Sequence, residues 1–440
     1  MSLPQIAYSG AKDWPGLRDR LAGRRNPGAS VETTVREILA RVRDRGDAAL
    51  AEYTRRFDCP DFTAAKLRVP KAALAKALKA IPKADAAILT EAIANVRAFH
   101  ERQRENSWLT TTADGAVLGQ MVLPVDRVGL YVPGGQGGET PLVSSLIMNA
   151  VPAQVAGVRE IAVVSPPRRD GTLNPYILAT AALLGIEEIH LCGSAWAVAA
   201  LAYGTKTIRA CDVIAGPGNI FVATAKALLV GEVGIDMIAG PSEIAIVADA
   251  SADPAWLAAD LLSQAEHDPL AACVLATWDK KLAAAVQKEL AAQLKRLPRG
   301  EIAAKSLADW GALALTPDQD AALDLVNRMA PEHLELAVAD PWAMLPFVRH
   351  AGAVFLGCHC PEPVGDYFAG PNHVLPTLGT ARFSSALSVQ TFCKKTSVIA
   401  APPSYVAEHG AKIARLARLE GLEAHARSVE CRIPKKQRKK

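Results

Sequence analysis

The sequence has no long hydrophobic run, no strong charge of either sign and no recognisable export signal. No apolar run reaches the roughly 20 residues that a membrane-spanning helix needs. The N-terminus lacks a basic region followed by an apolar core, so we predict no secretion. The net charge of +4 over 440 residues does not predict nucleic-acid binding, and the basic run 435–440 is interpreted as a solvated tail.

Paired-cysteine motifs are also missing. None of the eight cysteines forms a CxxC pair, and several lie inside apolar runs, which favours reduced, buried thiols in a cytoplasmic protein. The sequence Cys358-His359-Cys360 does not have the spacing of a zinc knuckle, so packing is its better interpretation.

What the sequence does contain predicts a folded α/β protein. Half of its residues are apolar and 21% are charged, which is typical of globular chains. From Val122 onward, short apolar runs alternate with helical patterns, as in βαβ units with a parallel sheet. We expect two such lobes, one with strands at 128–133, 161–165, 189–193 and 212–216, the other with strands at 243–249, 272–277, 311–315, 334–338 and 353–357. We also expect a short strand at 67–69 and a helical C-terminal segment.

Two glycine-rich turns raise the question of a cofactor. Residues 134–138 lie between a predicted strand and helix, but the turn fails the GxGxxG fingerprint, because Thr140 takes the place of the last glycine. Residues 216–219 (GPGN) also lie between a strand and a helix, and Asn219 can cap that helix. From these residues alone, a nucleotide site at the first turn stays open and a tight turn is favoured at the second.

The stretch 256–269 predicts an amphipathic helix that Pro269 ends. Gln264 and His267 are three residues apart and would share one face of it. Alone they are best interpreted as a hydrogen-bonding pair. With Asp366 and His425 they would offer two nitrogen and two oxygen ligands, a set that suits catalytic Zn²⁺, although no sequence rule makes the four converge.

A second polar group precedes a predicted strand. Glu332 and His333 offer a carboxylate that can activate water and an imidazole that can act as a base. The long loop after Gly357 adds His373 to Asp366, and loops of this length are often functional.

Seven stretches, in order, closely resemble histidinol dehydrogenase: GLYVPGG, AGPGNIFVATAK, GIDMIAGPSE, LLSQAEHDP, APEHLEL, GDYFAGPNHVLPT and EGLEAHA. The resemblance covers nearly the whole chain. It implies a cytoplasmic, zinc-dependent enzyme that oxidises L-histidinol through bound L-histidinal to L-histidine with two NAD, the last steps of histidine biosynthesis.

The resemblance also assigns residues. It gives catalysis to Glu332 and His333 and one zinc ion per subunit to Gln264, His267, Asp366 and His425. Substrate contacts fall on Ser242, on Glu420, on His333 and on the zinc ligands, with His373 a weaker candidate, and NAD contacts on Tyr131 and Asn219. Where the family usually has a glutamine that touches NAD, this chain has Trp196, whose indole could pack on the cofactor instead.

The implied fold is a pair of incomplete Rossmann-like lobes with small N- and C-terminal helical extensions used for dimerisation. We assign 1–27 to an N-terminal extension, 28–130 with 243–385 to the zinc and catalytic lobe, 131–242 to the NAD lobe, and 386–440 to a segment that enters the partner's active site in a homodimer. Three alternatives remain: a relative that oxidises another polar alcohol, a zinc hydrolase, and a metal-binding protein without activity. The two glycine-rich turns disfavour the hydrolase, and the Glu332–His333 pair disfavours the last.

Overall fold

The computed structural model describes residues 3–25, 29–135 and 138–434. The predicted solvated tail and part of the first glycine-rich turn lie outside these residues. The chain forms two compact units, one of residues 1–103 with 126–392 and one of residues 104–125 with 393–440. Each unit is described separately.

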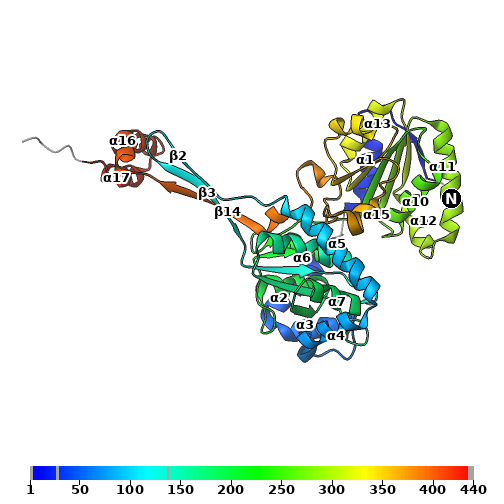
Figure 1. Ribbon diagram of the computed structural model, residues 1–440, viewed down its shortest axis with the longest axis horizontal. Helices are drawn as coiled ribbons and strands as arrows, with labels where there is room; N and C mark the ends of the chain where they lie inside the picture. Colours follow the sequence, from blue (N-terminus) through cyan, green and yellow to red (C-terminus); the bar gives the residue numbers. More distant parts are fainter. Residues whose placement is uncertain (1–2, 26–28, 136–137, 435–440) are drawn as a thin grey trace, which may run out of the picture. The chain divides into compact units, whose positions relative to one another are not determined.

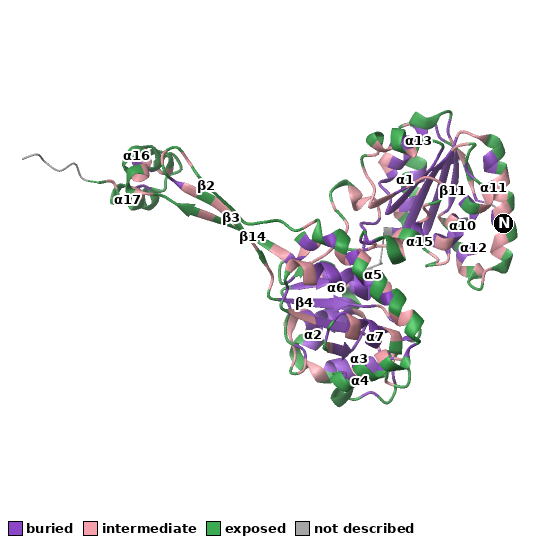
Figure 2. Cartoon of the chain, viewed as in Figure 1, coloured by how far each residue is buried: buried purple, intermediate pink, exposed green. Residues whose placement is uncertain are grey.

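The first unit contains a six-stranded sheet in which every neighbouring pair is parallel, in the order β1-β11-β10-β9-β12-β13. Its strands are β1 (Gln5–Ala7), β9 (Glu243–Ala248), β10 (Ala272–Thr277), β11 (Ala312–Leu315), β12 (His333–Ala337) and β13 (Ala353–Leu356). All residues of β9, β10 and β12 are buried, as expected for parallel strands covered on both faces (Figure 2).

Helices form a hydrophobic core on each face of this sheet. One core contains Leu257, Leu261, Val286 and Leu307 from α10 (Pro254–Ala265), α11 (Lys280–Gln293) and α12 (Gly300–Asp309). The other contains side chains of α1 (Trp14–Ala22), α13 (Gln319–Met329) and α14 (Pro341–Met344). A single helical turn, α15 (Glu362–Val364), and a π-helical turn, Gly365–Ala369, follow β13.

The same unit contains a five-stranded parallel sheet in the order β6-β5-β4-β7-β8. Its strands are β4 (Arg127–Tyr131), β5 (Glu160–Ser165), β6 (Glu188–Leu191), β7 (Val213–Ala215) and β8 (Gly234–Ile235), and the helices between them are α6 (Val143–Ala156), α7 (Pro175–Leu183), α8 (Ser194–Tyr203) and α9 (Ile220–Leu228). The prediction of an α/β protein with two parallel sheets is confirmed.

The helices that precede the five-stranded sheet in the sequence pack on its helices (Figure 1). Helix α2 contacts α8 and α9, α4 contacts α7, and α5 contacts α6. Their bounds are α2 (Ala29–Arg45), α3 (Asp47–Phe57), α4 (Lys71–Ala80) and α5 (Lys83–Glu101). These helices therefore lie beside the five-stranded sheet. The assignment of 28–130 with 243–385 to a zinc and catalytic lobe, and of 131–242 to an NAD lobe, stays a prediction.

Two local predictions need correction. Residues 67–69 do not form a strand: a 3-10 turn, Ala64–Lys66, precedes an isolated bridge between Arg68 and His190. Helix α10 ends at Ala265 rather than at Pro269, so His267 lies in the turn beyond it, where its backbone N–H donates to the carbonyl of Gln264. The two side chains therefore do not share a helix face.

The second unit pairs distant parts of the chain. Strand β3 (Val117–Pro124) is antiparallel to both β2 (Trp108–Thr111) and β14 (Cys393–Ala400), and α16 (Pro403–Leu419) packs on α17 (Glu423–Glu430). The expected C-terminal helices are present, but the strand β14 was not predicted. Within the described residues, no helix is both long and apolar enough to cross a membrane.

Candidate active site

The predicted catalytic pair lies at the amino end of β12. Glu332 is 7% exposed and His333 is 3% exposed. Both are held by the backbone of Glu243, which begins the neighbouring strand β9. The Glu243 N–H donates to Oε2 of Glu332 at 2.8 Å, and the Glu243 carbonyl lies 2.9 Å from Nδ1 of His333. A carbonyl can only accept, so Nδ1 carries the proton and Nε2 keeps a free lone pair.

Two carboxylates face that free nitrogen. Nε2 of His333 lies 3.7 Å from Oε1 of Glu362 and 3.8 Å from Oδ1 of Asp366. Glu362 and Asp366 are four residues apart in the consecutive turns after β13, which places them on one side of the chain. One donor atom from each of the three residues lies within 4.8 Å of the others, so this triad could hold a metal ion.

Burial controls the charge of these groups. Desolvation lowers the pKa of His333 to about 3, with further lowering from the nearby imidazoles of His373 and His267. It raises the pKa of Glu332 well above its ordinary value and that of Asp366 to about 7. His333 is therefore a neutral base at physiological pH, and the cluster of carboxyl groups is one that a cation would stabilise.

Several buried polar atoms near this cluster have no hydrogen-bond partner among the described residues. They are Nε2 of His333, Oε2 of Glu362, Oδ1 of Asp366 and Nε2 of His373. Both amide atoms of the predicted ligand Gln264 are also buried without partners. Buried polar groups are normally satisfied, so such a group of orphaned oxygen and nitrogen atoms indicates an absent ligand. Its donors, carboxylates and imidazoles, fit zinc.

A cavity of about 300 Å³ opens at the same place. Asp366 and His373 line it together with the apolar side chains of Phe99, Phe355 and Leu387. Its size suits a small ligand with one polar and one apolar side.

The other predicted ligands and substrate contacts are distributed over both units. Gln264 is fully buried in the last turn of α10, His267 is exposed, and Ser242 immediately precedes Glu243. Glu420 is the capping residue that follows α16, His425 lies in α17, and both are exposed residues of the second unit. The zinc set and the substrate contacts stay predictions.

The predicted NAD residues lie at the carboxyl ends of strands in the five-stranded sheet. The hydroxyl of Tyr131, at the end of β4, accepts from the backbone N–H of Ser194 at 3.1 Å. The carbonyl of Tyr131 packs so tightly on Gly216 that a Cβ there would lie 2.1 Å from it, which only glycine permits. Asn219 caps α9 by accepting from the N–H groups of Phe221 and Val222, as its sequence position indicated.

Trp196 is 5% exposed and packs within the protein. Its ring is stacked with Tyr53 at 5.5 Å and with Phe57 at 5.6 Å between centroids, both from α3. Its indole N–H is buried without a partner in the described part of the chain. The prediction that this side chain contacts NAD is not tested by these contacts.

Sequence reasoning missed two residues of the site. Glu362 was overlooked among the prolines of its loop, although its position four residues before Asp366 was a usable signal. Glu243 was missed because it acts chiefly through its backbone, which leaves no pattern in the sequence.

Comparison with known proteins agrees with this geometry. Residues 22–433 match the family model described as histidinol dehydrogenase. The histidinol dehydrogenase of Oleidesulfovibrio alaskensis is 65% identical over 97% of this chain and 99% of its own length, and that of Bacillus subtilis is 50% identical over 94% and 96%. The crystal structure of histidinol dehydrogenase from Elizabethkingia anophelis superposes with a TM-score of 0.91 at 33% identity, covering 98% of both chains. With this similarity along nearly its whole length, and with a buried Glu332–His333 pair beside a candidate metal site, the chain belongs to the histidinol dehydrogenase family.

Proposed function

We propose that this chain oxidises L-histidinol through bound L-histidinal to L-histidine, with His333 and Glu332 as its catalytic residues and two NAD consumed per turnover. The observation that carries the assignment of His333 is its fixed tautomer. Nδ1 is held by the Glu243 carbonyl, whereas Nε2 has no hydrogen-bond partner among the described residues and lies 3.7 Å from Glu362 and 3.8 Å from Asp366.

His333 serves as the general base in both oxidations. A buried, neutral imidazole can take the hydroxyl proton of the alcohol at Nε2. The same atom can take a proton from the hydrated aldehyde in the second oxidation. NAD, when bound near Tyr131, Trp196 and Asn219, supplies the acceptor for the hydride that each oxidation releases.

Glu332 serves the step between the two oxidations. Its Oε2 is held by the Glu243 N–H, so its position is fixed while it removes a proton from the water that attacks the aldehyde. Burial raises the pKa of Glu332, which makes it a stronger base once it is ionised.

The residues that would hold zinc are Gln264, His267 and Asp366 of one chain with His425. Bound there, zinc would supply a template that ligates the imidazole and the amine of the substrate and so fixes the carbon that reacts. Ser242, His373 and Glu420 would complete the contacts with the substrate and prevent the aldehyde from leaving.

We propose that His425 and Glu420 act in the active site of a second copy of the chain. Their unit exposes large apolar side chains: Leu109 and Ile399 on its sheet and Leu416 and Leu419 on α16 are each more than 60% exposed. A small unit with such a surface suits burial against another copy. Mixing inactive His333→Ala and His425→Ala chains after reversible dissociation should restore roughly a quarter of the activity, since half of the dimers gain one intact site. No recovery after verified subunit exchange would reject the shared site.

The overall proposal is tested by following NADH formation from NAD and L-histidinol, before and after removal of zinc with a chelator. We expect two NADH per histidinol, loss of activity on chelation, and recovery with added zinc while the circular dichroism spectrum stays unchanged. Turnover of another polar alcohol but not of histidinol, or full activity in metal-free protein, would contradict it.

A further inference from the structure

Arg24 is a buried arginine in the 3-10 turn Gly23–Arg25 that follows α1. Its side chain is 1% exposed and forms an ion pair with the carboxylate of Glu243, whose side chain is 2% exposed. Two further hydrogen bonds run from Nη1 to the carbonyls of Ser242, at 3.4 Å, and Leu270, at 3.3 Å. The guanidinium thus joins its own turn to two segments that are far from it in sequence, Ser242–Glu243 and the turn at Leu270.

Each of these segments leads to the proposed active site. Ser242 is a proposed substrate contact, and Leu270 ends the turn that carries the proposed ligand His267. Glu243 is the residue whose N–H and carbonyl hold Glu332 and His333. Arg24 itself contacts neither member of the catalytic pair in any of its recorded hydrogen bonds.

We propose that Arg24 is a positioning residue: through its ion pair with Glu243 it holds the backbone groups that orient Glu332 and His333. The inference rests on the proposed roles of that pair. Because Glu243 is anchored at its side chain by Arg24, its peptide groups are fixed at the start of β9. A small rotation there would turn both hydrogen bonds away from the catalytic side chains, and misplacement by about 1 Å can reduce a rate about a hundredfold.

The charge of Arg24 also acts on Glu332. Burial is the largest cause that raises the pKa of Glu332 and the carboxylate of Glu243 adds to it, whereas the cation of Arg24 lowers that pKa. A fork-shaped guanidinium suits this place better than an ammonium group, because it can serve a carboxylate and two carbonyls at once.

The test compares Arg24→Met, Arg24→Lys and the matched control Arg127→Met. Arg127 is also a buried, ion-paired arginine of the first unit, but its partners lie in the five-stranded sheet. For each variant, one measures kcat and KM for histidinol and for histidinal, KM for NAD, zinc content and thermal stability. We expect Arg24→Met to bind zinc normally and to lose about tenfold or more in kcat on both substrates, with KM for NAD unchanged. Arg24→Lys should recover part of this loss, and Arg127→Met should lose stability but keep kcat.

A kcat of Arg24→Met within about twofold of the unmodified chain, or an equal loss in Arg127→Met, would overturn the proposal. If Arg24→Met does not fold, Glu243→Gln keeps the backbone groups but weakens their anchor, and it should lower kcat by about tenfold; an unchanged kcat would overturn the proposal as well. The unmodified chain distinguishes the two hypotheses, because its own failure to oxidise histidinol would reject the proposed function instead.

Discussion

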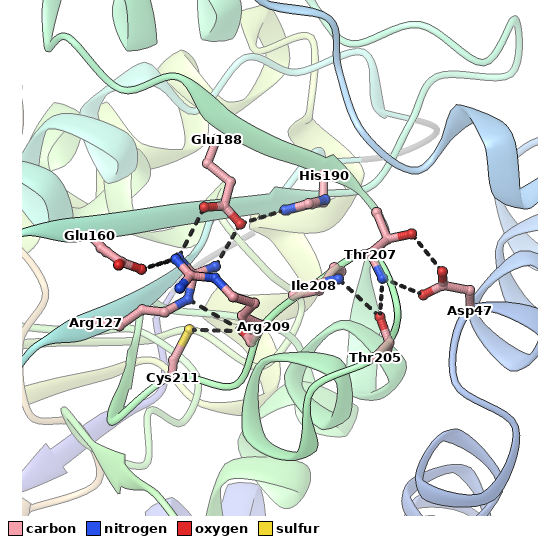
Figure 3. A network of polar contacts seen from close by, with 10 residues as sticks. All are labelled: Asp47, Arg127, Glu160, Glu188, His190, Thr205, Thr207, Ile208, Arg209 and Cys211. Carbon is pink, nitrogen blue, oxygen red and sulfur yellow. Dashed lines mark hydrogen bonds and ion pairs between the residues drawn. The ribbon is translucent and has the colours of Figure 1, made fainter.

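The amino ends of the two parallel sheets both carry buried charged side chains, but they differ in how these are satisfied. In the five-stranded sheet, Arg127 at the start of β4 donates to Glu160 at the start of β5 and to Glu188 at the start of β6, both at 3.0 Å, and Glu188 also contacts Nε2 of His190 (Figure 3). Arg209 completes the group by an ion pair with Glu160. This network joins three strands.

In the six-stranded sheet, the charges at the same end are organised around Glu243, Glu332 and His333, and important atoms are left without partners. Nε2 of His333 faces Glu362 and Asp366 at 3.7 and 3.8 Å, too far for hydrogen bonds. Leaving buried polar atoms unsatisfied costs free energy, and the fold tolerates that cost where a ligand can recover it. Nδ1 of His190 is also buried without a partner in the described part of the chain, so the contrast lies in the charges: those of Arg127 and Glu188 are paired, whereas those around His333 are separated. The paired charges serve structure, and the separated ones belong to the proposed chemistry.

The largest expected effect is a loss of kcat in variants of the Glu332–His333 pair. His333→Ala should lower kcat by about a thousandfold for both histidinol and histidinal, because it removes the proposed base for both oxidations. Glu332→Gln should strongly lower kcat for histidinal and for the complete oxidation of histidinol, because both include hydration of the aldehyde. The rate of the first hydride transfer, from histidinol to NAD, should change much less. Single-turnover measurements with each substrate separate the steps. Equal rates of histidinal oxidation in Glu332→Gln and the unmodified chain would contradict this division of roles.

The satisfied network should behave in the opposite way. Arg127→Met should reduce the free energy of unfolding by about 2 kcal/mol, since it leaves the half-buried Glu188 without its cation, and should leave kcat unchanged. Urea unfolding measures the loss. Arg36→Met is the control, because the Arg36–Glu32 pair is exposed and worth little. An equally small loss in both variants would show that the network is not structural.

The same network predicts a pH dependence. Burial raises the pKa of Glu188, but hydrogen bonds from His190 and Arg127 outweigh it and hold that pKa well below its ordinary value. A carboxylate of this kind stabilises the fold above its unfolded pKa, and the contribution is lost as pH falls through the folded value. Glu188→Gln should therefore make the free energy of unfolding less dependent on pH below about 4.5. An unchanged slope of the free energy of unfolding against pH would contradict an ionised pair of Glu188 and Arg127.

A smaller effect sharpens the comparison at Gln264. Its two amide atoms are buried without partners in the described protein, so Gln264→Met should raise the stability of zinc-free protein by about 1 kcal/mol. The same variant should lose zinc affinity, so its stability should respond little to added zinc. Urea unfolding with and without zinc checks both expectations, and a destabilised zinc-free variant would reject them.

The smallest effect is expected at Trp196. If the indole supports the cofactor, Trp196→Ala should raise the KM for NAD severalfold without changing that for histidinol. Trp196→Phe preserves a ring beside Tyr53 and Phe57 and serves as the matched variant. An unchanged KM for NAD in Trp196→Ala would show that this position does not affect cofactor binding.

The sequence by itself determined the elements with strong local signals. Buried parallel strands read as continuous apolar runs, so nine strands of the two sheets were predicted close to their observed bounds. The motifs around Glu332, His333, Gln264 and Asp366 carried the family and its proposed chemistry, because their residue types and order are specific.

The tertiary structure decided what depends on distant partners. Strands β1 and β14 are stabilised by β11 and β3, which lie far away along the chain, and their own residues give no periodic apolar pattern. Conversely, residues 67–69 have the sequence pattern of a strand but form only an isolated bridge, between Arg68 and His190. Arg24 could not be recognised as part of the site from its neighbours in sequence. Its role depends on an ion pair with Glu243, and such a pair exists only once both residues are buried in the same fold.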